Sequence, residues 1–394
     1  MTSGHSHHDH GPTGGETGRQ SSDGAQASPA KPRRQEQEPA SDEITEVAAG
    51  ILRSELPISI PGLGHVNCYL IEDERGFAVV DPGLPDKDSY RALTRRLGQA
   101  GVPISRVHTI VVTHSHPDHF GGAARLRADS GAEIVTHRRF RVLWDPSEPP
   151  DVDLDTAAAA LTSGSGSGSG SGSTADEKPQ RRLPWEPTPW GGQGMDVPWQ
   201  RRAWVRAARV FPKMLKIPRP TVRLDDSETI RLAGRQWVAV HTPGHTEDHL
   251  CLFDPETGTM LSGDHVLPTI TPHISGLIRA KDPLAEFFAS LDKIGTFADR
   301  TSTVLPAHGR PFTDLAGRVE AIKRHHHERL DIIRRVSNEA GAPTTVMEFS
   351  KHLFSPRSQG TMADSETFAH LEHLRLAGEA IQSRNGELLE YLIG

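Results

Sequence analysis

A regular pattern of apolar residues begins only near residue 43 of the 394-residue chain. Before it, Gly, Ser, Pro, Gln and charged residues follow one another without an apolar period, which predicts that residues 1–42 form a disordered tail. After it, "GHVNCYLIED" and "GFAVVDPG" are short apolar runs broken by turn residues, as β-strands are. The run "VHTIVVTH" is almost continuously apolar, which is typical of a strand buried on both faces.

Helical patterns alternate with these strands. In "DSYRALTRRLGQAG", Tyr90, Leu93 and Leu97 fall on one face of an amphipathic helix, and "HFGGAARLRADSG" is predicted as the next helix. Strands resume in "AEIVTH", "ETIRLAG", "QWVAVHTPGHT", "HLCLFDPETGTMLSGDHV" and "TSTVLPAHGRP", with the helix "DPLAEFFASLDKIG" before the last of them. This alternation predicts an α/β domain over residues 43–318.

An insertion over residues 141–220 interrupts this domain. Residues 163–173 alternate strictly between Ser and Gly, as a flexible linker does, and the sequence leaves open whether this run is natural or engineered. A basic stretch follows that contains Trp185, Trp190, Trp199 and Trp204. Two interpretations stay open for it: a lid whose tryptophans and arginines meet a substrate, or a helix that packs its tryptophans onto the domain.

Residues 319–394 are predicted to form a helical tail. A long helical pattern leads into two further helical stretches and the short hairpin "AIQSRNGELLEYLIG", an order that resembles a winged helix. Ile322, Leu330 and Ile333 form the apolar stripe of the first helix. We expect the triplet at residues 325–327, three consecutive histidines, to be exposed to solvent.

Composition narrows the class of protein. The formal net charge of -7 and the isoelectric point near 6.3 give no general attraction to nucleic acid or to an anionic membrane. No run of about 18 apolar residues occurs, so we expect no membrane span and a cytoplasmic protein. Cys68 and Cys251 both sit in apolar runs and are expected to be reduced core residues. A homodimer stays open.

Polar residues that bind metals follow the apolar strands at their ends. In an α/β sheet the strand ends share one edge, where sites form. The residues are Asp81, His114, His116, Asp118, His119, His245, Asp264 and His308. Imidazole and carboxylate groups suit zinc and related divalent ions. The sequence therefore predicts a metal site at this edge.

The order of these residues resembles the metallo-β-lactamase superfamily of hydrolases. An Asp after an early strand, the motif His-x-His-x-Asp-His, and then a His, an Asp and a final His all occur in the expected order. The resemblance covers about residues 43–318 without the insertion. It implies an αββα sandwich, in which two sheets pack between helices, with two divalent metal ions. Zn²⁺ is the ion expected, with Fe and Mn as alternatives.

The resemblance also implies a role for each residue. His114, His116 and His245 would hold the first metal, Asp118, His119 and His308 the second, and Asp264 would bridge both. Asp81 would orient a ligand histidine through a hydrogen bond. A hydroxide shared by the two metals would be the nucleophile, with Asp118 as a catalytic proton acceptor.

The pairing of Asp264 with His308 resembles the hydroxyacylglutathione hydrolase and ribonuclease Z branches more than true β-lactamases. The helical tail is similar to that of the β-lactamase-like 2 group, which includes thioesterases and single-strand endoribonucleases. We therefore expect a hydrolase of thioester or ester bonds, acting on a small molecule or on an acyl chain carried by a carrier protein or coenzyme A. A metal-dependent endoribonuclease or phosphodiesterase that binds nucleic acid is one alternative. A DNA-binding protein whose metal domain acts as a sensor is the other.

Overall fold

The computed structural model describes residues 34–60, 62–142, 185–194, 196–200, 202–203, 206 and 217–394. Most of the predicted tail, the Ser-Gly run and most of the insertion lie outside these residues. The predictions made for those segments are therefore not addressed by the structure.

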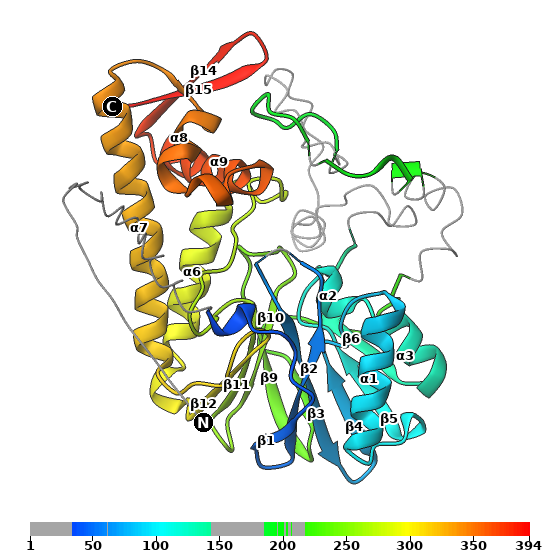
Figure 1. Cartoon of the computed structure of the whole chain (residues 1–394). Coiled ribbons are helices and arrows are strands. Elements are labelled where there is room, and N and C mark those ends of the chain that lie inside the picture. The colour runs from blue at the N-terminus through cyan, green and yellow to red at the C-terminus, as the bar shows by residue number, and fades with distance from the viewer. Residues whose placement is uncertain are drawn as a thin grey trace, which may run out of the picture. The chain divides into compact units, whose positions relative to one another are not determined.

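A seven-stranded sheet forms one half of the sandwich (Figure 1). Its strands, in spatial as well as sequence order, are β1 (Ile44–Ala48), β2 (Ile51–Pro57), β3 (His65–Asp73), β4 (Gly76–Val80), β5 (Val107–Val111), β6 (Glu133–His137) and β7 (Val222–Leu224). The strands from β1 to β4 pair antiparallel, and those from β4 to β7 pair parallel. Strand β5, which was predicted to be buried on both faces, has buried side chains except for the half-buried His108.

A five-stranded sheet faces the first one. Its spatial order is β12 (Thr303–Pro306), β11 (Thr259–Gly263), β10 (Leu250–Asp254), β9 (Arg235–His241) and β8 (Thr229–Leu232). Apolar side chains of both sheets meet in one cluster, in which Tyr69 and Val111 of the first sheet lie with Trp237, Leu252 and Leu305 of the second. This buried layer holds the two sheets face to face.

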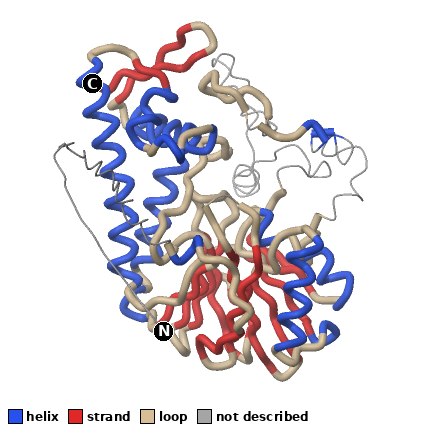
Figure 2. Tube along the Cα trace, in the orientation of Figure 1, coloured by secondary structure: helices blue, strands red, loops and turns tan. Residues whose placement is uncertain are grey.

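Helices cover both outer faces (Figure 2). Those on the first sheet are α1 (Lys87–Gln99), α2 (Pro117–Phe120) and α3 (Ala123–Ser130), and those on the second are α6 (Pro283–Gly295) and α7 (Leu315–Ala340). Short 3₁₀ turns lie at η1 (Gln35–Gln37), η2 (Ile104–Arg106), η4 (Ala298–Arg300) and η5 (Pro356–Ser358). Helix α1 starts where the Asp86 carboxylate accepts hydrogen bonds from two backbone amides of its first turn. Tyr90, Leu93 and Leu97 are buried on its inner face, as predicted. The predicted αββα architecture is confirmed.

After α7 the chain forms a helical region with a small sheet. The remaining elements are β13 (Thr344–Thr345), α8 (Val346–Leu353), α9 (Thr361–Leu376), β14 (Ala380–Asn385) and β15 (Leu388–Ile393), and the sheet has the order β13-β15-β14. The predicted C-terminal helical region is confirmed, and its interpretation as a winged helix stays a prediction. Its apolar side chains join those of α6, α7 and the second sheet in a single cluster.

Residues 34–42, at the end of the predicted tail, make specific contacts in the structure. Glu36, in η1, is buried, and its carboxylate accepts hydrogen bonds from the backbone amides of Thr269 and Ile270 and from the Thr269 hydroxyl. These long-range bonds fix residues 34–42 against the second half of the domain. These bonds could not be predicted from the polar composition of this segment, because the sequence is the same whether a carboxylate is buried or solvated.

The expectation that the three consecutive histidines are all exposed is wrong for His326. His326 is buried, His325 is half-buried and His327 is exposed. Because residues four apart share a helix face, His326 falls on the stripe between Ile322 and Leu330. Its Nδ1 lies 3.1 Å from Nε2 of His370 on α9, whereas its Nε2 has no hydrogen-bond partner among the described residues.

Within the described part of the insertion, one tryptophan packs onto the C-terminal region. Trp190 is buried, its ring centroid lies 5.2 Å from that of Phe368 on α9, and its carbonyl accepts from the Leu389 amide. Trp199 is exposed. For Trp190, the packing interpretation is therefore the better one.

Two smaller expectations can be compared with the structure. Cys68 and Cys251 are both buried and unpaired, as predicted. Among the helices that the structure describes, none is both long and apolar enough to span a bilayer. The cytoplasmic location remains a prediction.

Candidate metal centre

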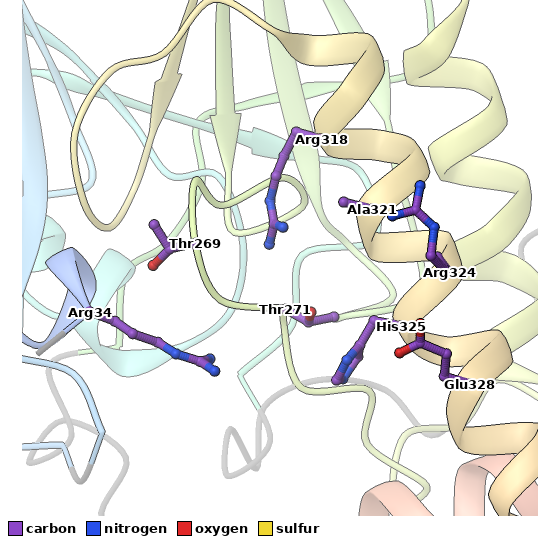
Figure 3. Close-up of a pocket in the computed structure, with 8 residues that line it drawn as sticks. All are labelled: Arg34, Thr269, Thr271, Arg318, Ala321, Arg324, His325 and Glu328. Atoms are coloured by element: carbon purple, nitrogen blue, oxygen red, sulfur yellow. The ribbon is translucent and has the colours of Figure 1, made fainter. Parts of the chain in front are cut away.

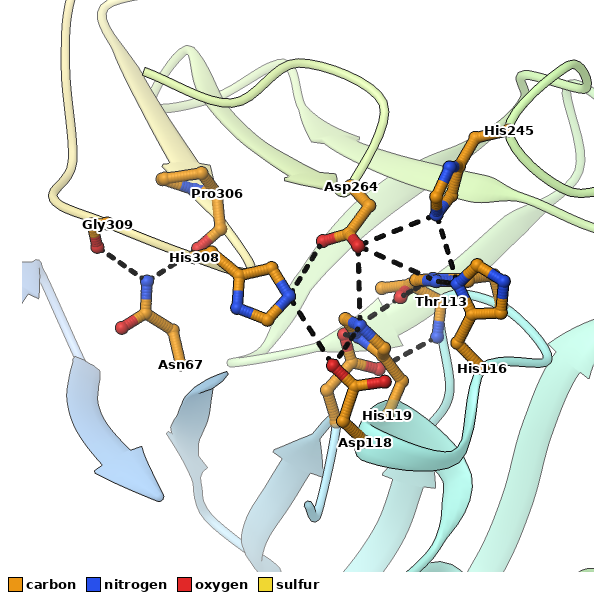
Figure 4. A network of polar contacts seen from close by, with 12 residues as sticks. Asn67, Thr113, His116, Asp118, His119, His245, Asp264, Pro306, His308 and Gly309 are labelled. Carbon is orange, nitrogen blue, oxygen red and sulfur yellow. Dashed lines mark hydrogen bonds and ion pairs between the residues drawn. The ribbon is translucent and has the colours of Figure 1, made fainter. Parts of the chain in front are cut away.

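The predicted site residues all lie at the carboxyl ends of strands, on loops that meet at one edge of the sandwich (Figure 4). Asp81 follows β4. His114 and His116 follow β5, and Asp118 and His119 sit in the short helix α2 that comes next. The other three candidates are His245 between β9 and β10, Asp264 directly after β11, and His308 just beyond β12. The structure thus brings together all the residues singled out in the sequence.

Three histidines and one aspartate form the first group. Nδ1 of His116 lies 3.0 Å from Nε2 of His114 and 3.1 Å from Nε2 of His245. The Oδ2 atom of Asp264 lies 3.8 Å from the His114 nitrogen and 3.5 Å from the His245 nitrogen. Their ligand atoms all lie within 4.8 Å of one another. Four donor atoms therefore converge on one small volume.

Asp118, His119 and His308 form the second group, and Asp264 lies beside it. The Oδ2 atom of Asp118 is 3.4 Å from Nε2 of His119 and 3.5 Å from Nε2 of His308. Asp264 reaches this group through both oxygens, with Oδ1 3.3 Å from the His308 nitrogen and Oδ2 3.6 Å from the His119 nitrogen. One carboxylate therefore touches both groups.

The ring nitrogens that point away from the site are held by the protein. Nδ1 of His245 donates to the His273 carbonyl at 2.7 Å, and Nδ1 of His308 donates to the His65 carbonyl at 2.6 Å. A donating Nδ1 fixes the neutral tautomer, so that Nε2 presents its lone pair to the site. Asn67 on β3 also binds the loop of His308, donating to the carbonyls on either side of it.

Asp81 orients the first motif. Its carboxylate accepts from the backbone amide and the hydroxyl of Thr113, at 2.9 and 2.8 Å, and from Nδ1 of His119 at 2.9 Å. Because the Thr113 hydroxyl donates to Asp81, it accepts from Nδ1 of His114 at 3.0 Å. Asp81 has φ of 52°, in the left-handed region, where Asp is one of the few tolerated residues.

Burial shapes the electrostatics of the site. Burial, and then the neighbouring His245, lower the pKa of His116 to about 3. Burial raises the pKa of Asp118, but the charge of His119 outweighs it and brings this pKa to about 2. Burial likewise opposes the charging of His119, yet the carboxylates of Asp118 and Asp264 raise its pKa well above the usual value.

Three buried atoms in the site lack a hydrogen-bond partner among the described residues: Nε2 of His119, Nε2 of His308 and Oδ1 of Asp264. A buried polar atom without a partner is costly. All three face the second group, where a cation would satisfy them together. The two clusters therefore fit a metal site, and imidazole with carboxylate is the donor set that zinc, iron and manganese share.

Several supporting residues were not found from the sequence. Thr113 bonds to Asp81 and His114, and Nε2 of His249 accepts the backbone amide of Asp264 at 3.0 Å. Nδ1 of His249 lies 2.7 Å from the Thr242 hydroxyl. Thr113 directly precedes His114, and that position is the one signal that could have identified it; His249 lies four residues after His245.

A family model described as the metallo-beta-lactamase superfamily matches residues 61–308. A probable metallo-hydrolase, YqjP of Bacillus subtilis (strain 168), is 26% identical over 332 residues, which are 82% of this chain and 91% of that protein. An atrochrysone carboxyl ACP thioesterase of Aspergillus fumigatus is 33% identical over 97 residues, 25% of this chain and 21% of that protein.

A solved structure covers nearly the whole chain. The crystal structure of the metallo-beta-lactamase family protein TTHA1429 from Thermus thermophilus superposes with a TM-score of 0.67 at 26% identity, over 89% of this chain and 100% of that one. This overlap extends beyond the sandwich into the C-terminal helical region.

Proposed function

The chain belongs to the metallo-β-lactamase superfamily, and on that basis we propose that it is a dinuclear metallo-hydrolase that cleaves an ester or thioester bond of a small or acyl substrate. The observation that carries this proposal is the position of Asp264. Its carboxylate lies 3.5 Å from His245 of the first group and 3.3 Å from His308 of the second. A shared carboxylate of this kind is what two neighbouring ions need.

In this proposal each group holds one divalent ion, with Asp264 in contact with both. The first group is His114, His116 and His245, and the second is Asp118, His119 and His308. Zn²⁺ is the proposed ion, because neutral imidazoles dominate the donor set, and Fe and Mn are tested beside it. When bound, two such ions polarise a carbonyl group and make water a nucleophile near neutral pH.

Two backbone carbonyls and one hydroxyl of this protein do the positioning. His65, His273 and Thr113 hold the ligand rings in one orientation, so the site needs little rearrangement when it is loaded. Asp118 is buried with one carboxylate oxygen near His119 and His308, and it is the proposed proton acceptor. Since these residues come from loops of both sheets, the sandwich as a whole builds the site.

Two observations favour an acyl substrate. The Aspergillus fumigatus relative is named as a thioesterase of an acyl carrier protein, although the match spans about a fifth of its length. The net charge of -7 does not favour a long polyanion such as RNA. A thioester carbonyl presents one electrophilic carbon and a good leaving group, which suits a site with no Ser or Cys nucleophile among its seven ligands.

The test is a substrate panel with metal analysis. The purified protein is loaded with zinc, manganese or iron and assayed on acyl thioesters, a lactone, a cephalosporin, a phosphodiester and single-stranded RNA. We expect thioester or ester turnover and two ions per chain. His116→Ala and His308→Ala should each lose metal and activity, whereas His327→Ala, at an exposed histidine, should keep both. Turnover of RNA alone, or full metal content in His116→Ala, would refute the proposal.

A further inference from the structure

A polar cavity of about 260 Å³ lies beside the N-terminal half of α7 (Figure 3). We call it the arginine pocket. Arg318, Arg324, His325 and Glu328 line it from α7, Thr269 and Thr271 line it from the loop after β11, and Arg34 lines it from the segment before η1. In Figure 3, Arg34 reaches toward the α7 side chains from the opposite wall. Three guanidinium groups thus surround one space.

The positive charge of the arginine pocket is poorly neutralised. Arg34 and Arg324 are exposed, and neither guanidinium group makes a hydrogen bond or ion pair with another described residue. Arg318 is held by the carbonyls of Leu267 and Ile270, which are uncharged acceptors. Glu328 is the one carboxylate among the lining residues. Three guanidinium groups therefore face one lining carboxylate, with the buried carboxylate of Glu36 next to it on Thr269.

Burial is the largest influence on the pKa values of Arg318 and His325, the two half-buried basic residues of the arginine pocket. Burial lowers the pKa of Arg318; after it, the nearby Glu36 carboxylate raises this pKa and the charge of Arg34 lowers it. Burial and the positive charge of Arg329 lower the pKa of His325, the carboxylates of Glu366 and Glu328 raise it, and Arg34 lowers it. A bound anion would favour the charged form of both side chains.

One loop joins the arginine pocket to the metal centre. The segment at residues 267–271 forms a wall of the pocket and starts three residues after Asp264. Two residues past its end, the carbonyl of His273 accepts from His245 of the first ligand group. An anion held against Thr271 therefore sits on the same loop that carries a metal ligand and supports another.

We propose that the arginine pocket binds a phosphate group on the carrier part of a thioester substrate, as in a phosphopantetheine-type thiol. Guanidinium groups present paired N–H donors that match phosphate oxygens, and the hydroxyl of Thr271 adds a further donor. The assignment to a substrate rests on the proposed thioesterase function. The binding of phosphate does not, so the two are tested separately.

The first experiment measures phosphate binding directly. Inorganic phosphate is titrated calorimetrically into the full-length, metal-loaded parent and into Arg34→Gln/Arg324→Gln. Arg335→Gln/Arg357→Gln removes the same charge from two exposed arginines outside the pocket. Since the metals also bind phosphate, the number of sites is compared between variants. We expect the pocket variant alone to lose one site, or to weaken it at least about tenfold, as loss of charged hydrogen bonds predicts. Equal phosphate binding by all three proteins would overturn the proposal that the arginine pocket binds phosphate.

The second experiment tests whether the phosphate in the arginine pocket belongs to a thioester substrate. The same acyl chain is supplied as its coenzyme A thioester and as its N-acetylcysteamine thioester, which has no phosphate. We expect the pocket variant to lose about tenfold in kcat/KM on the first substrate, mainly through KM, and to keep its rate on the second. Equal losses on both, with phosphate binding impaired, would show a site for free phosphate and overturn the substrate assignment. If the parent cleaves neither thioester, the proposed function is wrong, and the calorimetry still tests whether the arginine pocket binds phosphate.

Discussion

At the scale of single residues, the buried carboxylate of Asp81 orients several groups around it. It is almost fully buried and accepts three hydrogen bonds, two from Thr113 and one from His119. Through the Thr113 hydroxyl it also fixes the ring of His114. The two histidines belong to different ligand groups, so Asp81 positions part of each without touching the site itself.

Replacing Asp81 with Asn should weaken metal binding without unfolding the protein. Asn tolerates the left-handed backbone at this position, but its amide nitrogen cannot accept from a histidine, and it carries no charge. Loss of such a supporting partner typically costs about 10- to 100-fold in metal affinity. Competition with a chromophoric chelator measures the change.

The matched control is Asp73→Asn, which removes a carboxylate that bonds to His108 and Arg75 away from the site. It should leave metal affinity unchanged. If Asp81→Asn also binds both ions as the parent does, the positioning role assigned to Asp81 is wrong.

The candidate ligands were predictable because each one is a His or Asp within a few residues of the end of an apolar strand. Residue type and position in the pattern are both local properties. The hydrogen bonds that orient His245 and His308 were not predictable, because their acceptors are the backbone carbonyls of His273 and His65. Every residue has such a carbonyl, and only the three-dimensional path of the chain decides where it points.

At the scale of elements, helix α9 supports the loop that follows Asp264. Glu366 is buried on α9 and lies 3.2 Å from Nδ1 of His273, while its other oxygen pairs with Arg329 of α7. Next to it, Ser365 bonds to the amide of Gly276. The carbonyl of His273 in turn holds His245. The C-terminal region therefore reaches a metal ligand through one backbone group.

We predict that Glu366→Gln affects the two ligand groups unequally. Gln keeps the shape but loses the charge that fixes His273 and Arg329, so His245 should become less well oriented. We expect the first group to bind its ion several-fold more weakly, because loss of a supporting partner lowers metal affinity. The metal affinity of the second group should be unchanged. Stepwise cobalt titration, followed by absorption, separates the two binding events.

Glu372→Gln serves as the control, because Glu372 lies on the same helix and pairs with Arg375. It should leave both steps unchanged. Equal weakening of the two steps in Glu366→Gln would point to a general loss of stability and contradict the prediction.

Helices and strands with a clear hydrophobic period were predicted well. The wrong prediction that His326 is exposed shows what such a period cannot reveal. The stripe of α7 was drawn through Ile322, Leu330 and Ile333, and the polar residue between them was assigned to solvent. Its buried partner, His370, lies 44 positions further along the chain. A local window contains the period but not the distant partner, so it cannot distinguish a buried histidine from an exposed one.

At the scale of the whole molecule, the C-terminal region shares its core with the sandwich. The same apolar cluster contains Phe253 of the second sheet, Phe287 of α6, Ile322 of α7 and Tyr391 of β15. The boundary predicted at residue 318 therefore separates parts of one core. Sequence composition cannot show this, because both sides of the boundary look like self-sufficient amphipathic elements.

Ending the chain at residue 318 should consequently prevent stable folding. Among the core side chains that the truncation removes are four of α7, namely Val319, Ile322, Leu330 and Ile333. At about 1.5–3 kcal/mol for each buried side chain, these four alone are worth about 6–12 kcal/mol. That is the size of the whole net stability of a typical domain, about 5–15 kcal/mol. Thermal melting followed by circular dichroism, with gel filtration, measures the outcome. A cooperative transition with the metal content of the full chain would contradict it.

Asp264 also bears on how the centre can change over evolutionary time. Its carboxylate lies within 4 Å of His245 on one side and His308 on the other. A single heritable change at this position would therefore damage both proposed ion positions at once. The contacts of Asp118 within the centre are confined to the second group. A lineage that abandons one ion is expected to do so by losing Asp118 or His308 and to retain the aspartate that the remaining ion still needs.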